Sequence, residues 1–168
     1  MQRITVDTLT FDFQDEWLVT KLDEWAFYRK QFQNVCGGSK AVDVLALDGN
    51  RCAWFIEAKD YRRHRRTKTI DIAAEVAGKV RDSLAGLFTA HVNSVCEKER
   101  QMANSTFGAR RFRVVLHLEQ PAKHSKLFPR AINPANVTQK LKQLIKPIDP
   151  HPLVLEINHM KDVAWKVS

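Results

Sequence analysis

The spacing of apolar residues changes along the first part of the chain. Residues 4–6 and 9–13 place apolar side chains at every second position, which predicts half-buried β-strand. From about residue 15 to 33, apolar side chains recur at spacings of three, four and seven, which predicts an amphipathic helix. Gly37 and Gly38 end that pattern.

Two β-prone runs follow, joined by a tight turn. Residues 41–47 (AVDVLAL) predict a short strand, and residues 51–61 (RCAWFIEAKDY) predict its return. Asp48 and Gly49 between them are a strong signal for a hairpin turn. The sequence therefore predicts a β-hairpin in this part of the chain.

Helical and strand patterns alternate beyond the hairpin. Helical spacing resumes over residues 70–91, and a helical segment is predicted to continue past Ser94. Residues 112–118 (FRVVLHL) predict a strand. These elements give the middle of the chain a helix followed by a strand.

The last part of the chain begins with a helix signal. Asn133 followed by Pro134 is typical of an N-cap and first helical position, and Pro147 ends the helix. Residues 153–157 and 162–167 predict a closing hairpin.

The core order is helix, strand, strand, helix, strand, helix, strand, which predicts an α/β fold with a mixed sheet flanked by helices. No repeat, low-complexity stretch or Gly/Ser linker divides residues 1–168, so we expect a single domain. The 4 tryptophans mostly fall at apolar positions of these elements, which favours core packing over base stacking.

Charge and cysteine usage narrow the functional classes. Lys and Arg number 27 against 19 for Asp and Glu, a surplus of +8 that favours a polyanionic partner, above all nucleic acid. The 3 cysteines are widely spaced with no CxxC pair, which argues against a disulfide framework and a zinc site and favours the cytoplasm. No apolar run has the length of a membrane helix, so no membrane partner is expected.

A basic run follows the predicted hairpin directly. Its side chains suit capture of a phosphate backbone, and the alternative is a solvated loop without a ligand. The predicted nucleic-acid contacts are Arg62, Arg63, Arg65, Arg66 and Lys68.

The hairpin itself carries a chemical pattern. Glu57 and Lys59 share one face of the second strand, about 6.6 Å apart along it, and pairing of the strands would bring Asp43 across from Glu57. Mg²⁺ or Mn²⁺ suits such oxygen ligands, so the predicted metal ligands are the two carboxylates and a backbone carbonyl near Ala58. The ammonium group beside them could position a water molecule. The alternative is a Glu57–Lys59 surface ion pair with Asp43 as an edge-strand charge.

The segment GSKAVDVLALDGNRCAWFIEAKDY resembles the catalytic hairpin of the PD-(D/E)xK nuclease superfamily. Asp43 matches the aspartate, Glu57 the (D/E) position and Lys59 the lysine of the motif. Val42 stands where the motif has proline, which removes no ligand. The resemblance implies a restriction-endonuclease-like fold.

Members of this superfamily often carry a further acidic residue on the first helix. The resemblance implies Glu24 for this position, with Asp23 and Glu16 as alternatives.

The resemblance implies a metal-dependent nuclease that hydrolyses phosphodiester bonds, with DNA favoured over RNA. A small oligonucleotide as substrate stays open, and specificity would come from structure, from a homodimer or from a partner protein. The alternative class is a non-enzymatic module of the same fold that binds nucleic acid or a nucleotide.

Glu75 and Lys79 lie four residues apart on the second predicted helix. This spacing favours an ion pair between them on the helix surface. A position flanking the hairpin site is the alternative.

Overall fold

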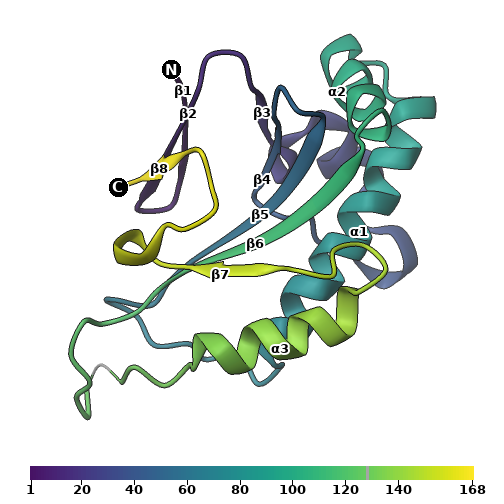
Figure 1. Cartoon of the computed structure of the whole chain (residues 1–168). Coiled ribbons are helices and arrows are strands. Elements are labelled where there is room, and N and C mark those ends of the chain that lie inside the picture. The colour runs from purple at the N-terminus through teal and green to yellow at the C-terminus, as the bar shows by residue number, and fades with distance from the viewer. Residues whose placement is uncertain (128) are drawn as a thin grey trace.

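Two β-sheets and a layer of helices stack against one another in the computed structural model of the chain (Figure 1). The structure describes residues 1–127 and 129–168. The larger sheet lies in the middle, with helices against one face and the smaller sheet against the other. Each face of the larger sheet therefore has its own hydrophobic core. The described chain is a mixed α/β structure, as predicted.

The smaller sheet is built from both ends of the chain. Strands β1 (Gln2–Val6) and β2 (Leu9–Phe13) form an antiparallel hairpin, and β8 (Lys166–Val167) pairs antiparallel with β2. In β2, Leu9, Phe11 and Phe13 are buried against the larger sheet, while the two residues that alternate with them are partly exposed. The predicted alternation in this region is confirmed.

The larger sheet has five strands in the order β3-β4-β5-β6-β7. Neighbours from β3 to β5 are antiparallel, and those from β5 to β7 are parallel, so the predicted mixed sheet is confirmed. The strands are β3 (Leu18–Lys21), β4 (Val44–Leu47), β5 (Cys52–Asp60), β6 (Arg111–Glu119) and β7 (Leu153–Leu155).

Three α-helices occupy the regions where helical spacing was found. Helix α1 (Ile72–Asn93) begins at Asp71, whose carboxylate accepts two backbone N–H groups of the first turn. Helix α2 (Glu97–Phe107) follows a short break, and α3 (Pro134–Ile145) begins at the predicted Asn133 cap. Helices α1 and α3 pack on one face of the larger sheet. None of the helices in the described part of the chain combines the length and apolar character needed to cross a bilayer.

The predicted helix over residues 15–33 is wrong. This stretch forms β3, a 3₁₀ turn (Leu22–Glu24) and a π-helical turn (Tyr28–Phe32). Pairing with β4 draws the first part into the sheet edge, where tertiary contacts outweigh local helical spacing. The indole N–H of Trp25 donates to the Thr20 hydroxyl at 2.8 Å and holds the turn against the strand.

A distant carboxylate fixes the start of this helical turn. Glu99 of α2 is buried and accepts from the backbone N–H groups of Ala26 at 2.7 Å and Phe27 at 3.2 Å. A further 3₁₀ turn (Val35–Gly37) leads toward β4. The contact with α2 is remote in sequence, so no local pattern could reveal it.

The predicted hairpin of residues 153–157 with 162–167 is also wrong. Strand β7 pairs in parallel with β6, and β8 joins the other sheet. A 3₁₀ turn (Ile157–His159) separates them, and the Ile157 N–H donates to Glu119 at 2.7 Å. Burial of Leu155 between the two sheets favours this split arrangement over a local hairpin.

Helix α1 is tied to the residue that precedes Asp43. The Ser83 hydroxyl accepts from the buried N–H of Val42 at 2.9 Å and donates to the Lys79 carbonyl at 2.7 Å. This contact fixes the entry to β4 against the helix.

We expect Ser83→Ala to destabilise the protein by about 1–3 kcal/mol, because it leaves the Val42 N–H buried without an acceptor. Urea unfolding measures the change. Thr89→Ala is the matched control, since the Thr89 hydroxyl bonds only to carbonyls of its own helix. Equal effects of the two changes would contradict the anchoring role of Ser83.

Candidate functional site: a buried carboxylate between two lysines

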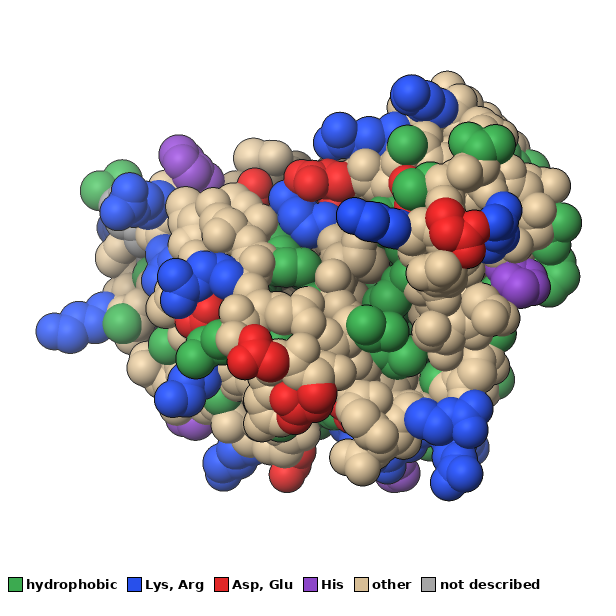
Figure 2. Space-filling model, turned by 90° about the horizontal axis from the view of Figure 1, so that it is seen from above, with side chains coloured by type: hydrophobic (Ala, Val, Ile, Leu, Met, Phe, Trp, Pro, Cys, Tyr) green, Lys and Arg blue, Asp and Glu red, His purple; other side chains and the backbone are tan. Residues whose placement is uncertain are grey.

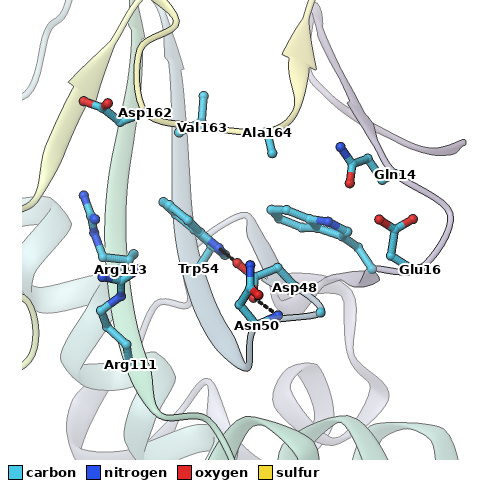
Figure 3. A pocket seen from close by; sticks show the side chains of 12 residues that line it. Gln14, Glu16, Asp48, Asn50, Trp54, Arg111, Arg113, Asp162, Val163 and Ala164 are labelled. Atoms are coloured by element: carbon cyan, nitrogen blue, oxygen red, sulfur yellow. Dashed lines mark hydrogen bonds between the residues drawn. The ribbon is translucent and has the colours of Figure 1, made fainter.

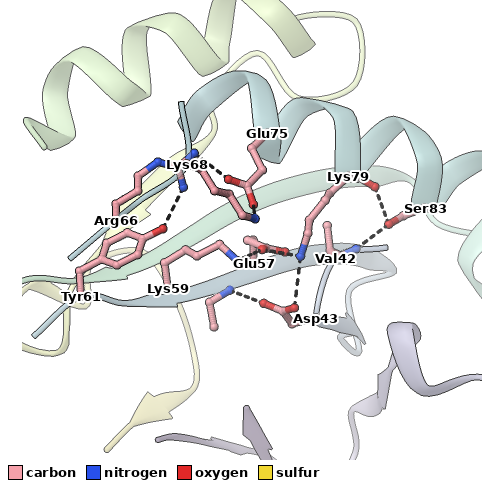
Figure 4. Close-up of polar contacts among 11 residues, drawn as sticks. Val42, Asp43, Glu57, Lys59, Tyr61, Arg66, Lys68, Glu75, Lys79 and Ser83 are labelled. Carbon is pink, nitrogen blue, oxygen red and sulfur yellow. Dashed lines mark hydrogen bonds and ion pairs between the residues drawn. The ribbon is translucent and has the colours of Figure 1, made fainter. Parts of the chain in front are cut away.

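Glu57 stands in the middle of the described fold with no exposed side-chain surface. It lies on β5, the central strand of the larger sheet, between β4 and β6. Its side chain points to the face covered by α1, where Figure 4 shows it beneath the helix. An isolated charge at such a position is strongly unfavourable, so the carboxylate needs partners.

Two ammonium groups supply them. The Nζ atoms of Lys59 and Lys79 lie 2.5 Å and 2.6 Å from Oε1 of Glu57 (Figure 4). Lys59 reaches it along the strand, and Lys79 descends from α1. The second carboxylate oxygen, Oε2, is buried and makes no hydrogen bond with the described residues.

Asp43 joins the cluster just before β4. Its Oδ2 accepts from the Ala58 N–H at 2.8 Å, and its Oδ1 lies 3.5 Å from the Lys79 ammonium nitrogen. Asp43 and Glu57 therefore face the same cation, as the paired strands predicted, but that cation is a protein ammonium group. The Ala58 N–H contacts the cluster through Asp43, and a backbone carbonyl near Ala58 as a metal ligand stays a prediction.

Burial controls the protonation of this cluster. Burial raises the pKa of Glu57, repulsion from Asp43 raises it further, and the lysines oppose both effects. Burial alone would lower the pKa of Lys59, but attraction to Glu57 outweighs it and raises that pKa. The charges of the cluster balance, because two carboxylates face two ammonium groups.

Asp23, and not Glu24, is the acidic residue of the preceding turn that faces this cluster. Burial raises the pKa of Asp23, and so does the nearby Asp43, while Oδ1 of Asp23 is buried without a hydrogen-bond partner. Glu24 pairs with Lys21 at 2.6 Å and is half exposed. Glu16 lines a cavity that includes neither Asp43 nor Glu57. The choice of Glu24 thus gives way to its alternative, because the 3₁₀ turn orients neighbouring residues differently from an α-helix.

The predicted Glu75–Lys79 surface pair is wrong. Both side chains point from α1 toward the sheet (Figure 4). Lys79 pairs with Glu57, while Glu75 pairs with Arg66 at 2.8 Å and with Lys68. The alternative, in which these helix residues flank the hairpin site, is correct for Lys79.

A spacing of four on α1 could have revealed Lys79. Glu75, Lys79 and Ser83 lie on one face of the helix, and each contacts the loop or strands beneath it. An acidic, a basic and a hydroxyl side chain along one helix face indicate polar partners on the neighbouring layer.

The basic run after β5 divides into two groups. Arg62 is held by Asp60, and Arg66 and Lys68 are held by Glu75. Arg63 and Arg65 are exposed and have no acidic partner among the described residues. Only this second group keeps its positive charge fully available to a phosphate.

Positive charge is dispersed on one face of the molecule. On the face shown in Figure 2, Lys and Arg side chains are scattered, with Asp and Glu side chains among them. That face has no continuous basic stripe.

The described residues contain no cluster of three or more His, Cys, Asp or Glu side chains that could hold a metal ion.

The complete chain is similar to part of a known enzyme. It is similar to a cysteine–tRNA ligase of Neisseria meningitidis serogroup A. The two are 31% identical over an alignment 210 residues long, which covers 100% of this chain. The chain spans 30% of the length of that relative. No family model matches the chain, and no solved structure matches it. The chain is therefore similar to a segment of a cysteine–tRNA ligase.

This similarity corrects the prediction of a DNA-cleaving nuclease. The aligned region includes the whole hairpin with Asp43, Glu57 and Lys59, yet the relative is named as a ligase acting on tRNA, not as a nuclease or other hydrolase. The E-x-K spacing places the charged side chains together, but it does not establish phosphodiester hydrolysis.

We expect the stability supplied by Glu75 to depend on pH. Burial alone would raise the pKa of Glu75, but Lys68 and Arg66 hold it down at about 2. Its contribution is present above the usual value of 4.5 and is lost as the pH falls from there through about 2. Glu75→Gln should therefore destabilise the protein strongly at pH 7 and progressively less below pH 4.5, as measured by urea unfolding. Exposed Glu97, changed to Gln, is the control, and a pH-independent effect of Glu75→Gln would contradict the prediction.

Proposed function

We propose that this chain is a nucleic-acid-binding domain that serves tRNA charging, with tRNA as its polyanionic partner. The observation that carries this proposal is the similarity of the complete chain to a segment of a cysteine–tRNA ligase. RNA thereby replaces DNA as the favoured nucleic acid. Because the chain matches 30% of that ligase, the partner protein we propose is a tRNA-ligase body, in the same polypeptide or a separate one.

The loop after β5 supplies the phosphate contacts in this proposal. Arg63 and Arg65 are exposed, unpaired in the described structure and free to displace counterions from an RNA backbone. Arg62, Arg66 and Lys68 hold the loop to the fold through Asp60 and Glu75.

The fold we propose is restriction-endonuclease-like. The antiparallel β3–β5 hairpin region, the parallel β5–β7 region and the covering helices support this assignment. One fold hosts many functions, so the assignment is compatible with a binding domain.

A divalent cation, Mg²⁺ or Mn²⁺, fits the hairpin cluster. Oε2 of Glu57 is a buried oxygen without a partner, and Asp43 supplies a second carboxylate beside it. Bound there, the cation would offset both negative charges and attract a phosphate oxygen of the RNA. Lys59 and Lys79 perform the same neutralisation in the structure described here.

We expect Arg63→Ala with Arg65→Ala to weaken tRNA binding and to reduce its salt dependence. Each lost phosphate contact should lower the log–log slope by about 0.7 to 0.9. Filter binding at several salt concentrations measures both quantities. Lys30→Ala with Lys142→Ala is the matched control, because both side chains are exposed and neither has an acidic partner among the described residues.

The bound tRNA should remain full length after incubation with Mg²⁺. Unchanged binding by the loop variant, or progressive loss of full-length tRNA, would contradict a binding role for this domain.

We expect Mg²⁺ or Mn²⁺ to raise the melting temperature of the wild-type protein, because the cation binds the folded state alone. A cation concentration about 100 times its Kd should stabilise the folded protein by about 2.7 kcal/mol. Each kcal/mol should raise the melting temperature by about 2–4 °C. Asp43→Asn with Glu57→Gln should abolish this response, and Asp7→Asn with Glu97→Gln, at exposed positions, should keep it. A wild-type melting curve that ignores millimolar cation would exclude the metal site and leave the lysines as the permanent counterions.

A further inference from the structure

A cavity of about 670 Å³ lies away from the lysine–carboxylate cluster. It opens where the turn between β4 and β5, the start of β6 and the segment before β8 meet (Figure 3). Trp54 lines it and lies three residues before Glu57 on β5, so the two side chains point to opposite faces of the larger sheet. The cavity is therefore a separate site, and its volume is in the range of small-molecule pockets.

Two indole rings form its aromatic wall. The rings of Trp17 and Trp54 are within 23° of parallel, with centroids 6.4 Å apart. Trp165 packs edge-on against both and leaves them little freedom to turn. Trp17 is 4% and Trp54 6% exposed, so only a small part of each ring reaches the cavity, where it offers a rigid apolar contact.

Two arginines line one side of the cavity in Figure 3. The Arg113 guanidinium lies 5.3 Å from the Trp54 ring centroid and is held by the His151 carbonyl at 3.0 Å and by Asp149 at 3.4 Å. Arg111 is exposed and has no acidic partner among the described residues. Its guanidinium also bonds the Cys52 thiol, a neutral partner, so Arg111 is the arginine whose charge can serve a phosphate.

The remaining polar side chains suit a base edge and a ribose. The amides of Gln14 and Asn50 line the cavity and make no side-chain hydrogen bond to the described residues. Asp48 is already occupied by two backbone N–H groups and the Trp54 indole, so it braces the turn. Glu16 and Asp162 line the cavity as exposed hydrogen-bond acceptors.

We propose that this cavity binds one ribonucleotide, with its base against the exposed parts of the tryptophan rings, its polar edge at the amides of Gln14 and Asn50, and its phosphate at Arg111. The nucleotide is either a free mononucleotide or an unpaired residue of an RNA. The RNA source rests on the proposed function, whereas the free source does not.

Quenching of tryptophan fluorescence tests this assignment, with adenosine monophosphate as one probe and a short single-stranded oligoribonucleotide as the other. Asn50→Ala with Arg111→Gln should weaken binding about tenfold or more, because a charge-assisted hydrogen bond and an amide contact are lost. Both changed side chains are at the surface, so the tryptophan core is kept. Arg110→Gln is the control, since Arg110 is exposed next to Arg111 but does not line the cavity.

Quenching by the mononucleotide that weakens only in the cavity variant supports a free nucleotide, and quenching by the oligoribonucleotide alone supports an RNA residue. Absence of quenching by both probes, or quenching that the cavity variant leaves unchanged, overturns the nucleotide site. If the wild-type protein does not bind tRNA but its fluorescence is quenched by the mononucleotide, the proposed function is overturned and the nucleotide site is kept.

Discussion

The buried carboxylate of Glu57 is the interaction on which the rest of the fold depends. A negative charge in the central strand is tolerable only with cations held against it, and Lys59 and Lys79 are both within hydrogen-bond distance of one oxygen. Lys79 can reach that oxygen only if α1 lies directly over β5. The charge requirement therefore sets the position of the helix, and the Ser83 contact with Val42 then places Asp43 beside it.

The larger sheet separates two kinds of chemistry by the alternation of its side chains. Odd-numbered residues of β5, such as Glu57 and Lys59, face the helices and form a charge-balanced polar cluster. Trp54, at an even-numbered position, faces the smaller sheet and joins an aromatic core with an open cavity. The two faces share a strand but no side chain, so the polar cluster and the cavity are separate sites.

The hairpin motif predicted the position of the charged residues correctly, but it did not predict the function. Asp43, Glu57 and Lys59 converge as their spacing predicted, and Lys79 completes the cluster. The same residues lie within a region similar to a tRNA ligase, which removes the nuclease interpretation. Converging charges show where a cation or phosphate would bind, but reactivity depends also on what positions the substrate, and no strand pattern encodes that.

Local periodicity determined the elements whose contacts are local. The strands around the turn at Asp48, helix α1 and the Asn133 cap of α3 were all predicted, because neighbours in sequence supply their hydrogen bonds and their apolar faces.

Tertiary structure decided the elements whose partners are remote. Residues 18–21 became a strand because β4 offers an edge, and β7 and β8 separated because β6 and β2 pair with them better than they pair with each other. The roles of Lys79 and Asp23 were likewise set by packing across layers. The sequence by itself determined which charges this protein carries on its central strand, and only the fold decided which groups neutralise them, since burial makes a charge depend on partners brought from distant segments.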